Sequence, residues 1–372
     1  MNQNSICFAT EIDLAAPLIG GGLVNDLKTV RCLKKLGKVD VIYLQKLKYV
    51  PMLRALLVFM LQLVRTFSKS YTVYFSRSLI ASAILIVFRP MIKGKIVHQA
   101  LSVPFPSNEV KYLAPDSRAR ASQSRLELQV RYYLTRFMEK FVLANVDYIT
   151  VAAPEYAREL FDFGIGEDKV KVIPFYVEEE FYRQPLKRHV EGTFTFCYVG
   201  AFHRYHELAS LIEAYELMSK SNRDTHLLLV GNGPTRSQVE RDVDRRNLGD
   251  RIKFLGTLTH SSMPFFLSNV DVFVLLTHAP GLPIGSIEAA AAGKAIIING
   301  GRSVSLSRFF RHGKEVYMVY SFSPEEIAEA MELLSRDTKL RVSLAQRARA
   351  AAREHFSENR TSQSLQDLLA EF

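Results

Sequence analysis

The chain has 372 residues, of which 48% are hydrophobic and 23% charged, with 19 glycines and 14 prolines. This composition is typical of a folded globular protein and excludes a disordered or collagen-like chain. At about 100 to 200 residues per domain, the length predicts two domains, each able to fill a hydrophobic core. A formal net charge of +10 favours anionic partners: nucleic acid, an acidic lipid surface or a phosphorylated ligand.

Cysteine spacing and hydropathy limit the cellular setting. Cys7, Cys32 and Cys197 lie far apart, without metal-ligand spacing, so neither a disulfide framework nor a zinc site is predicted and a reducing cytoplasm fits. No signal-peptide pattern opens the chain. The most apolar runs, 55–64 and 79–88, are each about ten residues long, short of the roughly 20 that cross a bilayer. We expect no membrane-spanning helix.

Apolar runs alternate with amphipathic stretches through the first half, a pattern typical of a parallel sheet covered by helices. A glycine triplet, Gly20-Gly21-Gly22, follows the first run and precedes a helix expected over 23–36. The expected strands are 5–9, 39–44, 73–75, 96–98, 148–151 and 170–173. Residues 177–192 are charged and irregular, which indicates a connection between domains.

A second alternating series follows this connection. Its expected strands are 194–199, 226–230, 252–255, 272–275, 295–298 and 316–319, and its expected helices are 208–219, 237–247, 284–292 and 324–335. The pattern predicts an α/β protein with two doubly wound, Rossmann-like domains facing across a cleft. In such sheets, ligands bind beyond the carboxyl ends of the strands.

The loop and helix over 281–293 form the most informative segment. Gly281 opens a Gly/Pro loop that leads into a helix of small residues. The free amides at such a helix start, with the positive end of its dipole, suit a phosphate, so Gly285 and Ser286 are candidates. Glu288 lies one turn in, where an ionised carboxylate can accept hydrogen bonds from both hydroxyls of a ribose. The alternative is a surface glutamate that stabilises only the helix dipole.

The glycine triplet is a second candidate. At Gly21 and Gly22 the backbone can approach a diphosphate or a sugar closely, because glycine has no side chain and tolerates positive φ. The alternative is a tight strand-to-helix turn without a ligand. The triplet does not match the GxGxxG fingerprint of dinucleotide-binding proteins.

The segment 281–298 resembles the signature of the retaining glycosyltransferases of the group 1 type (glycosyltransferase family 4), which have the two-domain GT-B fold. Segments that agree in order and spacing are Gly20-Gly21-Gly22, Val172-Ile173-Pro174, Val199-Gly200, Leu211-Ile212-Glu213-Ala214, 230–234, Phe254-Leu255-Gly256 and His312-Gly313-Lys314-Glu315. The resemblance covers most of the chain and is strongest from Gly200 onward. We expect an acceptor-side domain over 1–180, a nucleotide-sugar-binding domain over 181–350, and a helix over 351–372 that packs back on the first domain.

The resemblance implies a set of donor-binding residues. Glu288 is expected on the ribose, and the backbone near Gly256 and Thr257 near the base; Gly200, Gly281, Gly285 and Ser286 complete the donor set of this half. The family motif places a glutamate eight positions before Glu288, where this chain has Pro280. That glutamate normally engages the donor sugar, so this departure leaves open how the sugar is held.

Two cations that the family places on the diphosphate are also replaced. Alignment puts Ala201 and His206 at the positions of an arginine and a lysine. His206 can still donate to a phosphate oxygen, and Arg204 or His203 can supply charge, because a guanidinium binds phosphate bidentately. We therefore predict His206 and Arg204 as catalytic. The alternative is that 202–206 form a solvated loop.

Two stretches of the first half that are both basic and apolar are candidates for receiving the acceptor. Residues 51–69 are apolar with basic ends, and a later helix carries one apolar stripe beside several arginines; the stripe contains Leu126, Val130, Leu134, Phe137 and Phe141. Such a domain can rest on an anionic membrane and receive a lipid-linked acceptor. The alternative is that both are core helices, since an apolar stripe normally faces a core. His98, inside an expected strand, is more typical of a core residue than of a catalyst.

The sequence thus predicts a hexosyl-type glycosyltransferase (EC 2.4 class) that moves a sugar, with retention, from a nucleotide diphosphate sugar to a glycan or lipid-linked acceptor. Cell-surface polysaccharide or glycolipid biosynthesis is the expected process. We expect a cytoplasmic protein, at the inner face of the plasma membrane if it contacts anionic lipid. No cofactor, no metal and no nucleic-acid partner are expected, since no nucleic-acid-binding motif accompanies the charge.

Two alternatives remain. One is an inactive relative that acts as a binding or scaffold subunit, which Pro280 and Ala201 favour. The other is a GT-B-like nucleotide-sugar epimerase, which requires an acid/base cluster that the sequence does not reveal.

Overall fold

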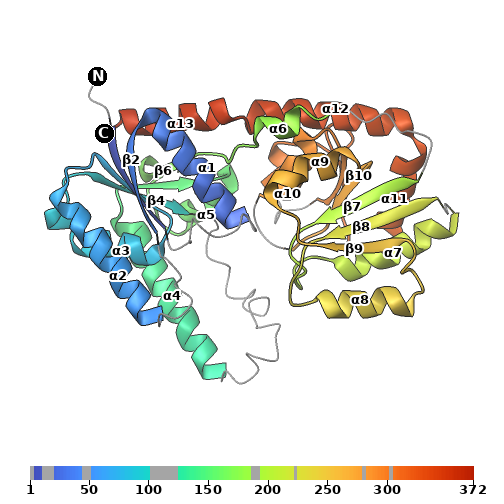
Figure 1. Cartoon of the computed structure of the whole chain (residues 1–372), viewed down its shortest axis with the longest axis horizontal. Helices are drawn as coiled ribbons and strands as arrows, with labels where there is room; N and C mark the ends of the chain where they lie inside the picture. Colours follow the sequence, from blue (N-terminus) through green and yellow to red (C-terminus); the bar gives the residue numbers. More distant parts are fainter. Residues whose placement is uncertain are drawn as a thin grey trace. The chain divides into compact units, whose positions relative to one another are not determined.

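The structure is a computed structural model that describes residues 4–10, 21–43, 52–100, 125–185, 193–221, 224–278, 282–300 and 305–372. They form two units (Figure 1). The first contains the described residues up to 100, those from 125 to Tyr176, and Glu358–Phe372; the second contains those from Val177 to Ser357. The unit boundaries, 176/177 and 357/358, fall a few residues from the expected 180/181 and 350/351.

The first unit is built on a parallel sheet in the order β2-β1-β3-β4-β5-β6. Its strands are β1 (Asn4–Thr10), β2 (Gly37–Tyr43), β3 (Val73–Ser76), β4 (Lys95–Ala100), β5 (Tyr148–Val151) and β6 (Val170–Val172). Ile6 of β1 pairs with both Val39 of β2 and Val73 of β3. The winding therefore reverses between β1 and β3, and a reversal of this kind is where doubly wound sheets bind ligands.

The helices of the first unit are α1 (Gly21–Leu36), α2 (Met52–Arg65), α3 (Leu79–Val87), α4 (Arg125–Asn145), α5 (Pro154–Asp162) and α13 (Glu358–Ala370). Cys32 and Leu33 of α1 share a hydrophobic core with Leu365 and Leu368 of α13, so the C-terminal helix is part of this unit.

The expected glycine loop is partly wrong. Gly21 and Gly22 are the first residues of α1, which begins two residues before the expected Leu23. The first amides of any helix lack intrahelical partners, so glycine weakens this position less than a helix interior. Gly20 lies outside the described residues.

The second unit has a parallel sheet in the order β12-β11-β10-β7-β8-β9. Its strands are β7 (Phe194–Val199), β8 (Thr225–Val230), β9 (Ile252–Gly256), β10 (Val272–Leu275), β11 (Ala295–Asn299) and β12 (Tyr317–Val319). Every residue of β10 and β11 is buried, because helices cover both faces of a parallel sheet. The winding reverses between β7 and β10.

The helices of the second unit are α6 (Glu179–Tyr182), α7 (Leu208–Ser221), α8 (Arg236–Arg245), α9 (Met263–Ser268), α10 (Ile284–Ala291), α11 (Pro324–Arg336) and α12 (Thr338–His355). α7 packs against α8 and α11, whereas α10 packs against α6 and α12, so these two groups cover different parts of the sheet (Figure 1). The expected irregular connection contains a helix, α6, that the sequence pattern did not predict. Among the described helices, none has the length and apolarity needed to cross a bilayer.

Candidate functional site

The start of α10 lies at the point where the second sheet reverses its winding. α10 begins at Ile284, and a Cβ added at Gly285 would lie 3.3 Å from the carbonyl oxygen of Val199, the last residue of β7. Gly285 is therefore packed against the carboxyl end of β7, beside Gly200. The fold thus brings together two segments that the sequence analysis identified separately, the one at Val199-Gly200 and the one that begins at Gly281.

The first turn of α10 carries no cap from the side chain at its N-cap, Pro283, although the amide of Ser286 bonds to the Pro283 carbonyl at 3.0 Å. Ser286 is 1% exposed, and its hydroxyl has no hydrogen-bond partner within the described part of the chain. A helix start with this polarity attracts anions. Gly281 and Pro280 lie outside the described residues.

Glu288 is buried and belongs to a cluster of three titratable side chains. Its Oε1 lies 3.6 Å from Nδ1 of His260, and Nε2 of the same ring lies 3.0 Å from Oε1 of Glu178. His260 opens a short 3₁₀ helix, His260–Ser262, in the connection after β9. Glu178 immediately precedes α6. Glu288 is thus held beside titratable side chains and is not the surface glutamate of the alternative interpretation.

One ligand atom from each of Glu178, His260 and Glu288 lies within 4.8 Å of the others, close enough for a shared metal ion. A shared ion binds through a single ring nitrogen. Here each nitrogen of His260 faces a different carboxylate. The imidazole therefore bridges the two carboxylates, which is not the geometry of three ligands around one shared ion.

The loop after β7 carries the predicted cations. Arg204 is exposed, and it lines a hollow of about 740 Å³ together with His203, His206 and Glu207 and with residues of α7 and α8. No residue of α10 lines that hollow. The structure therefore brings Arg204 and His206 together but does not place them in one pocket with Glu288.

His206 differs from the expected cation. Its ring lies edge-on to the rings of Tyr198 and Tyr205. Burial, with a smaller contribution from neighbouring His203, lowers the pKa of His206 to about 4. The ring is therefore neutral near pH 7 and supplies no positive charge there, so the expectation that it replaces a lysine charge is not supported by its surroundings.

Two side chains tie this loop to the segment after β10. Glu207 Oε1 lies 2.8 Å from Nε2 of His278, and the Thr277 hydroxyl donates to the carbonyl of Tyr205 at 3.1 Å. Because β7 and β10 are neighbours, these contacts fix the two loops that flank the reversal. Sequence reasoning did not identify this pair.

The remaining donor candidates also follow strand ends. Gly256, with φ of +68°, ends β9, and its carbonyl accepts from the amide of Gly231 at 2.7 Å. Gly200 follows β7 and donates to the Val230 carbonyl at 3.0 Å. Thr257 is exposed. All of these residues lie at the carboxyl edge of the second sheet.

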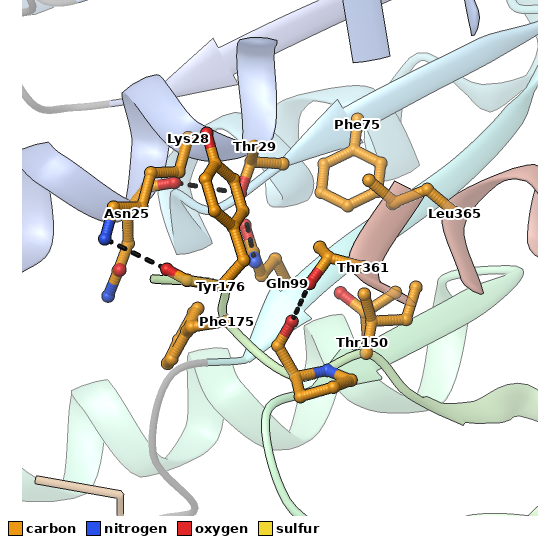
Figure 2. Close-up of a pocket in the computed structure, with 12 residues that line it drawn as sticks. Asn25, Lys28, Thr29, Phe75, Gln99, Thr150, Phe175, Tyr176, Thr361 and Leu365 are labelled. Atoms are coloured by element: carbon orange, nitrogen blue, oxygen red, sulfur yellow. Dashed lines mark hydrogen bonds between the residues drawn. The ribbon is translucent and has the colours of Figure 1, made fainter. Parts of the chain in front are cut away.

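The first unit contains a small cavity beneath α1 (Figure 2). Its interior offers only about 10 Å³ to the centre of a water molecule, room for about one water. Lys28 donates to the Tyr176 carbonyl at 3.0 Å beside it, while the side-chain oxygens of Asn25, Gln99 and Thr150 have no described partner. This cavity suits a single buried water and is too small for a sugar.

A buried ion pair lies where the first sheet reverses its winding. Asp26 of α1 contacts Arg77, which follows β3, and accepts from the Thr10 hydroxyl at the end of β1 at 2.6 Å. Burial raises the pKa of Asp26, and the Arg77 charge opposes that effect. The pair ties α1 to the ends of both strands.

His98 is buried in β4 with Nδ1 2.9 Å from the Ser82 hydroxyl, as expected of a core histidine.

The apolar stripe of α4 does not face a core. Val130, Leu134 and Phe137 are 49%, 59% and 71% exposed, and Tyr133 between them is 68% exposed. The core interpretation is therefore wrong for this part of α4. In α2, Phe59 and Leu63 are buried, so that helix does have a core face.

Comparison with known proteins shows what the second unit is similar to. Residues 179–351 match the family model described as glycosyl transferases group 1. The lipopolysaccharide core biosynthesis glycosyltransferase LpsD of Rhizobium meliloti is 29% identical over 230 residues, 60% of this chain and 64% of that protein. The O-antigen chain mannosyltransferase C of Escherichia coli is 26% identical over 208 residues, 54% of this chain and 52% of that protein. The chain thus spans between about half and two thirds of the length of these two relatives.

Solved structures share the fold of the whole chain. Sucrose-phosphate synthase from Thermosynechococcus elongatus matches with a TM-score of 0.77 and 20% identity over 99% of each chain. HepE from Anabaena, solved with UDP and glucose, matches with a TM-score of 0.73 and 16% identity over 100% of each chain. The expected α/β class and GT-B fold are confirmed. Through residues 179–351, the chain is similar to the group 1 glycosyltransferases.

Proposed function

We propose that the protein transfers a sugar from a nucleotide diphosphate sugar to a hydroxyl of a glycan or lipid-linked acceptor, in the assembly of a cell-surface polysaccharide or glycolipid. The observation that carries the proposal is the buried Glu288 carboxylate on α10, whose first turn abuts the end of β7. The names of relatives that act in lipopolysaccharide core and O-antigen synthesis support the process, and HepE with UDP and glucose supports the donor class.

In this proposal, Glu288 accepts hydrogen bonds from the ribose hydroxyls, and the first turn of α10 with Ser286 faces the diphosphate. Negative charge grows on the leaving diphosphate as the glycosidic bond breaks, so donors and cations aimed at it lower the barrier. Arg204, exposed on the loop after β7, is the cation we assign to this role. It lines the hollow beside α7 and α8, so the assignment requires its side chain to turn toward α10. The neutral, half-buried ring of His206 acts by holding that loop.

The anomeric configuration is retained in this proposal, and the transfer needs no metal. The helix dipole of α10 and a guanidinium supply the positive potential that a divalent cation provides in other transferases.

We assign the exposed apolar face of α4 in the first unit to contact with an anionic membrane surface. This face is made by Val130, Tyr133, Leu134 and Phe137. Exposed contiguous apolar side chains mark interaction sites, and an apolar face with basic neighbours binds the headgroup region of anionic lipids. Lys140 on the same helix is exposed, and the chain carries a formal net charge of +10. Docking there would bring the enzyme to a lipid-linked acceptor at the cytoplasmic face of the membrane.

A scaffold function is the second candidate. Ala201 stands where the family has an arginine, and the pKa of His206 is lowered to about 4, so the loop after β7 carries less charge than a transferase of this family needs. A relative with such a loop can hold a nucleotide sugar without turning it over.

One experiment separates these candidates. Purified protein is titrated with UDP-, GDP- and ADP-sugars by calorimetry, and each donor that binds is incubated with oligosaccharide and lipid-linked acceptors. Transfer of the sugar supports the enzyme. Donor binding without transfer or hydrolysis supports the scaffold, and no binding of any nucleotide sugar contradicts both.

A further inference from the structure

His260 lies between two carboxylates that are far apart in the second unit's sequence, Glu178 near its start and Glu288 on α10. Nε2 is 3.0 Å from Glu178 and Nδ1 is 3.6 Å from Glu288, and the Glu178 and Glu288 side chains are 16% and 8% exposed. The ring also packs on Phe181 of α6, with 5.6 Å between ring centroids. Packing on one side and a carboxylate at each nitrogen leave the imidazole little freedom to turn.

We propose that His260 is a positioning residue for donor binding: it holds the carboxylate of Glu288 in place for the ribose, and Glu178 in turn orients the His260 ring. This inference rests on the proposed function, because it assigns Glu288 to the nucleotide. The inference adds two residues to the donor site: His260, after β9, and Glu178, before α6. The sequence pattern did not connect either residue with the site.

The geometry gives the reason. A carboxylate on a helix turns freely about its side-chain bonds, and fixing it before the ligand arrives removes an entropy cost from binding. The ring nitrogen lies 3.6 Å from one oxygen of Glu288, and an ionised carboxylate has several acceptor sites, so this contact is compatible with ribose binding. The Glu178 carboxylate lies 3.0 Å from the other ring nitrogen, Nε2, and so fixes the orientation of the ring. Second partners orient histidine ligands in metal sites in the same way.

Two carboxylates and one aromatic ring surround the imidazole among the described residues: Glu178, ahead of α6, Glu288 of α10, and Phe181 of α6. Removing the imidazole therefore takes a polar contact from both carboxylates at once.

The test uses the full chain and whichever of UDP, GDP and ADP binds it. His260→Ala is expected to weaken nucleotide binding and raise the donor KM by about tenfold, the loss typical when a buried carboxylate loses its polar neighbour, while kcat changes much less. His260→Gln keeps an N–H donor and recovers part of this affinity. Ser261→Ala, at the exposed next position, is the matched control and binds as the wild type does.

Glu178→Gln is the second arm and keeps the inference testable if His260→Ala folds poorly. It is expected to shift donor KM in the same direction, by about threefold, because it acts through His260. If Glu288→Ala weakens nucleotide binding but His260→Ala and Glu178→Gln do not, the inference is wrong and the proposed function stands. If none of the three variants alters affinity, Glu288 is not at the nucleotide and both fail.

Discussion

The backbone of Gly231 passes so close to Gly200 that no side chain fits between them. A Cβ built on Gly231 would overlap the carbonyl oxygen of Gly200, and Gly231 has φ of +131°, which side chains rarely allow. The loops after β7 and β8 are therefore pressed together at the carboxyl edge of the second sheet, and glycine is required for this contact.

Gly231→Ala should lower the stability of the second unit by about 3 kcal/mol or more, since it combines a strained φ with a backbone overlap. Urea unfolding followed by circular dichroism measures the loss. Gly249→Ala is the control, because nothing lies within 4 Å of a Cβ at Gly249 and its φ is not in the strained range. Equal stability of the two variants would show that the close approach is absent.

Arg77→Met should destabilise the first unit by about 3 to 5 kcal/mol, because it leaves the buried carboxylate of Asp26 without its partner charge. Thermal unfolding is the measurement. The double variant Asp26→Asn with Arg77→Met removes both charges and should recover part of the loss. A single variant that unfolds at the wild-type temperature would contradict the buried pair.

His98 should make the first unit less stable at acidic pH. Burial lowers the pKa of His98 from 6.5 to about 4, so the unfolded chain binds a proton that the folded chain does not between these values. The contribution of neutral His98 to the free energy of unfolding is fully present above about pH 6.5 and is lost as the pH falls toward 4. At pH 5 the loss is about 2 kcal/mol. His98→Gln should flatten this dependence in urea unfolding at pH 7.5 and pH 5. An unaltered pH dependence in the variant would mean that His98 titrates normally.

Phe137→Glu should reduce binding to vesicles of phosphatidylglycerol at least about tenfold, since a buried aromatic side chain contributes roughly 1.5 to 3 kcal/mol to membrane contact. Vesicle co-sedimentation measures it, with neutral phosphatidylcholine vesicles for comparison. Val342→Glu, on α12 in the second unit, provides an exposed apolar position outside the proposed face. Equal sedimentation of both variants and the wild type would contradict the assignment of α4 to the membrane surface.

The strands were predictable from the sequence because a parallel sheet is buried on both faces. Runs such as 272–275 and 295–298 are apolar throughout, and every expected strand agrees with the structure within two residues at each end. The two-fold repetition of this alternation was enough to predict an α/β protein of two doubly wound units.

The site was only partly predictable. Helix starts and glycines are local signals, so Gly285, Ser286 and Glu288 were found from their own segment. His260 lies 82 residues from Glu178, in a polar stretch without a distinctive pattern, and no local signal connects the two. The charge of His206 depends on burial between Tyr198 and Tyr205, and the exposure of α4 depends on which helices cover the sheet; neither is written in the local sequence.

The central claim is that Glu288 binds the nucleotide, and the affinity of Glu288→Gln for UDP, GDP and ADP tests it most directly. Calorimetry should show a loss of about 1 to 3 kcal/mol for the nucleotide that the wild type binds. Glu325→Gln, an exposed glutamate in the first turn of α11, should bind as the wild type does, because it can affect only its own helix dipole. Equal nucleotide affinity of Glu288→Gln and the wild type would contradict the account.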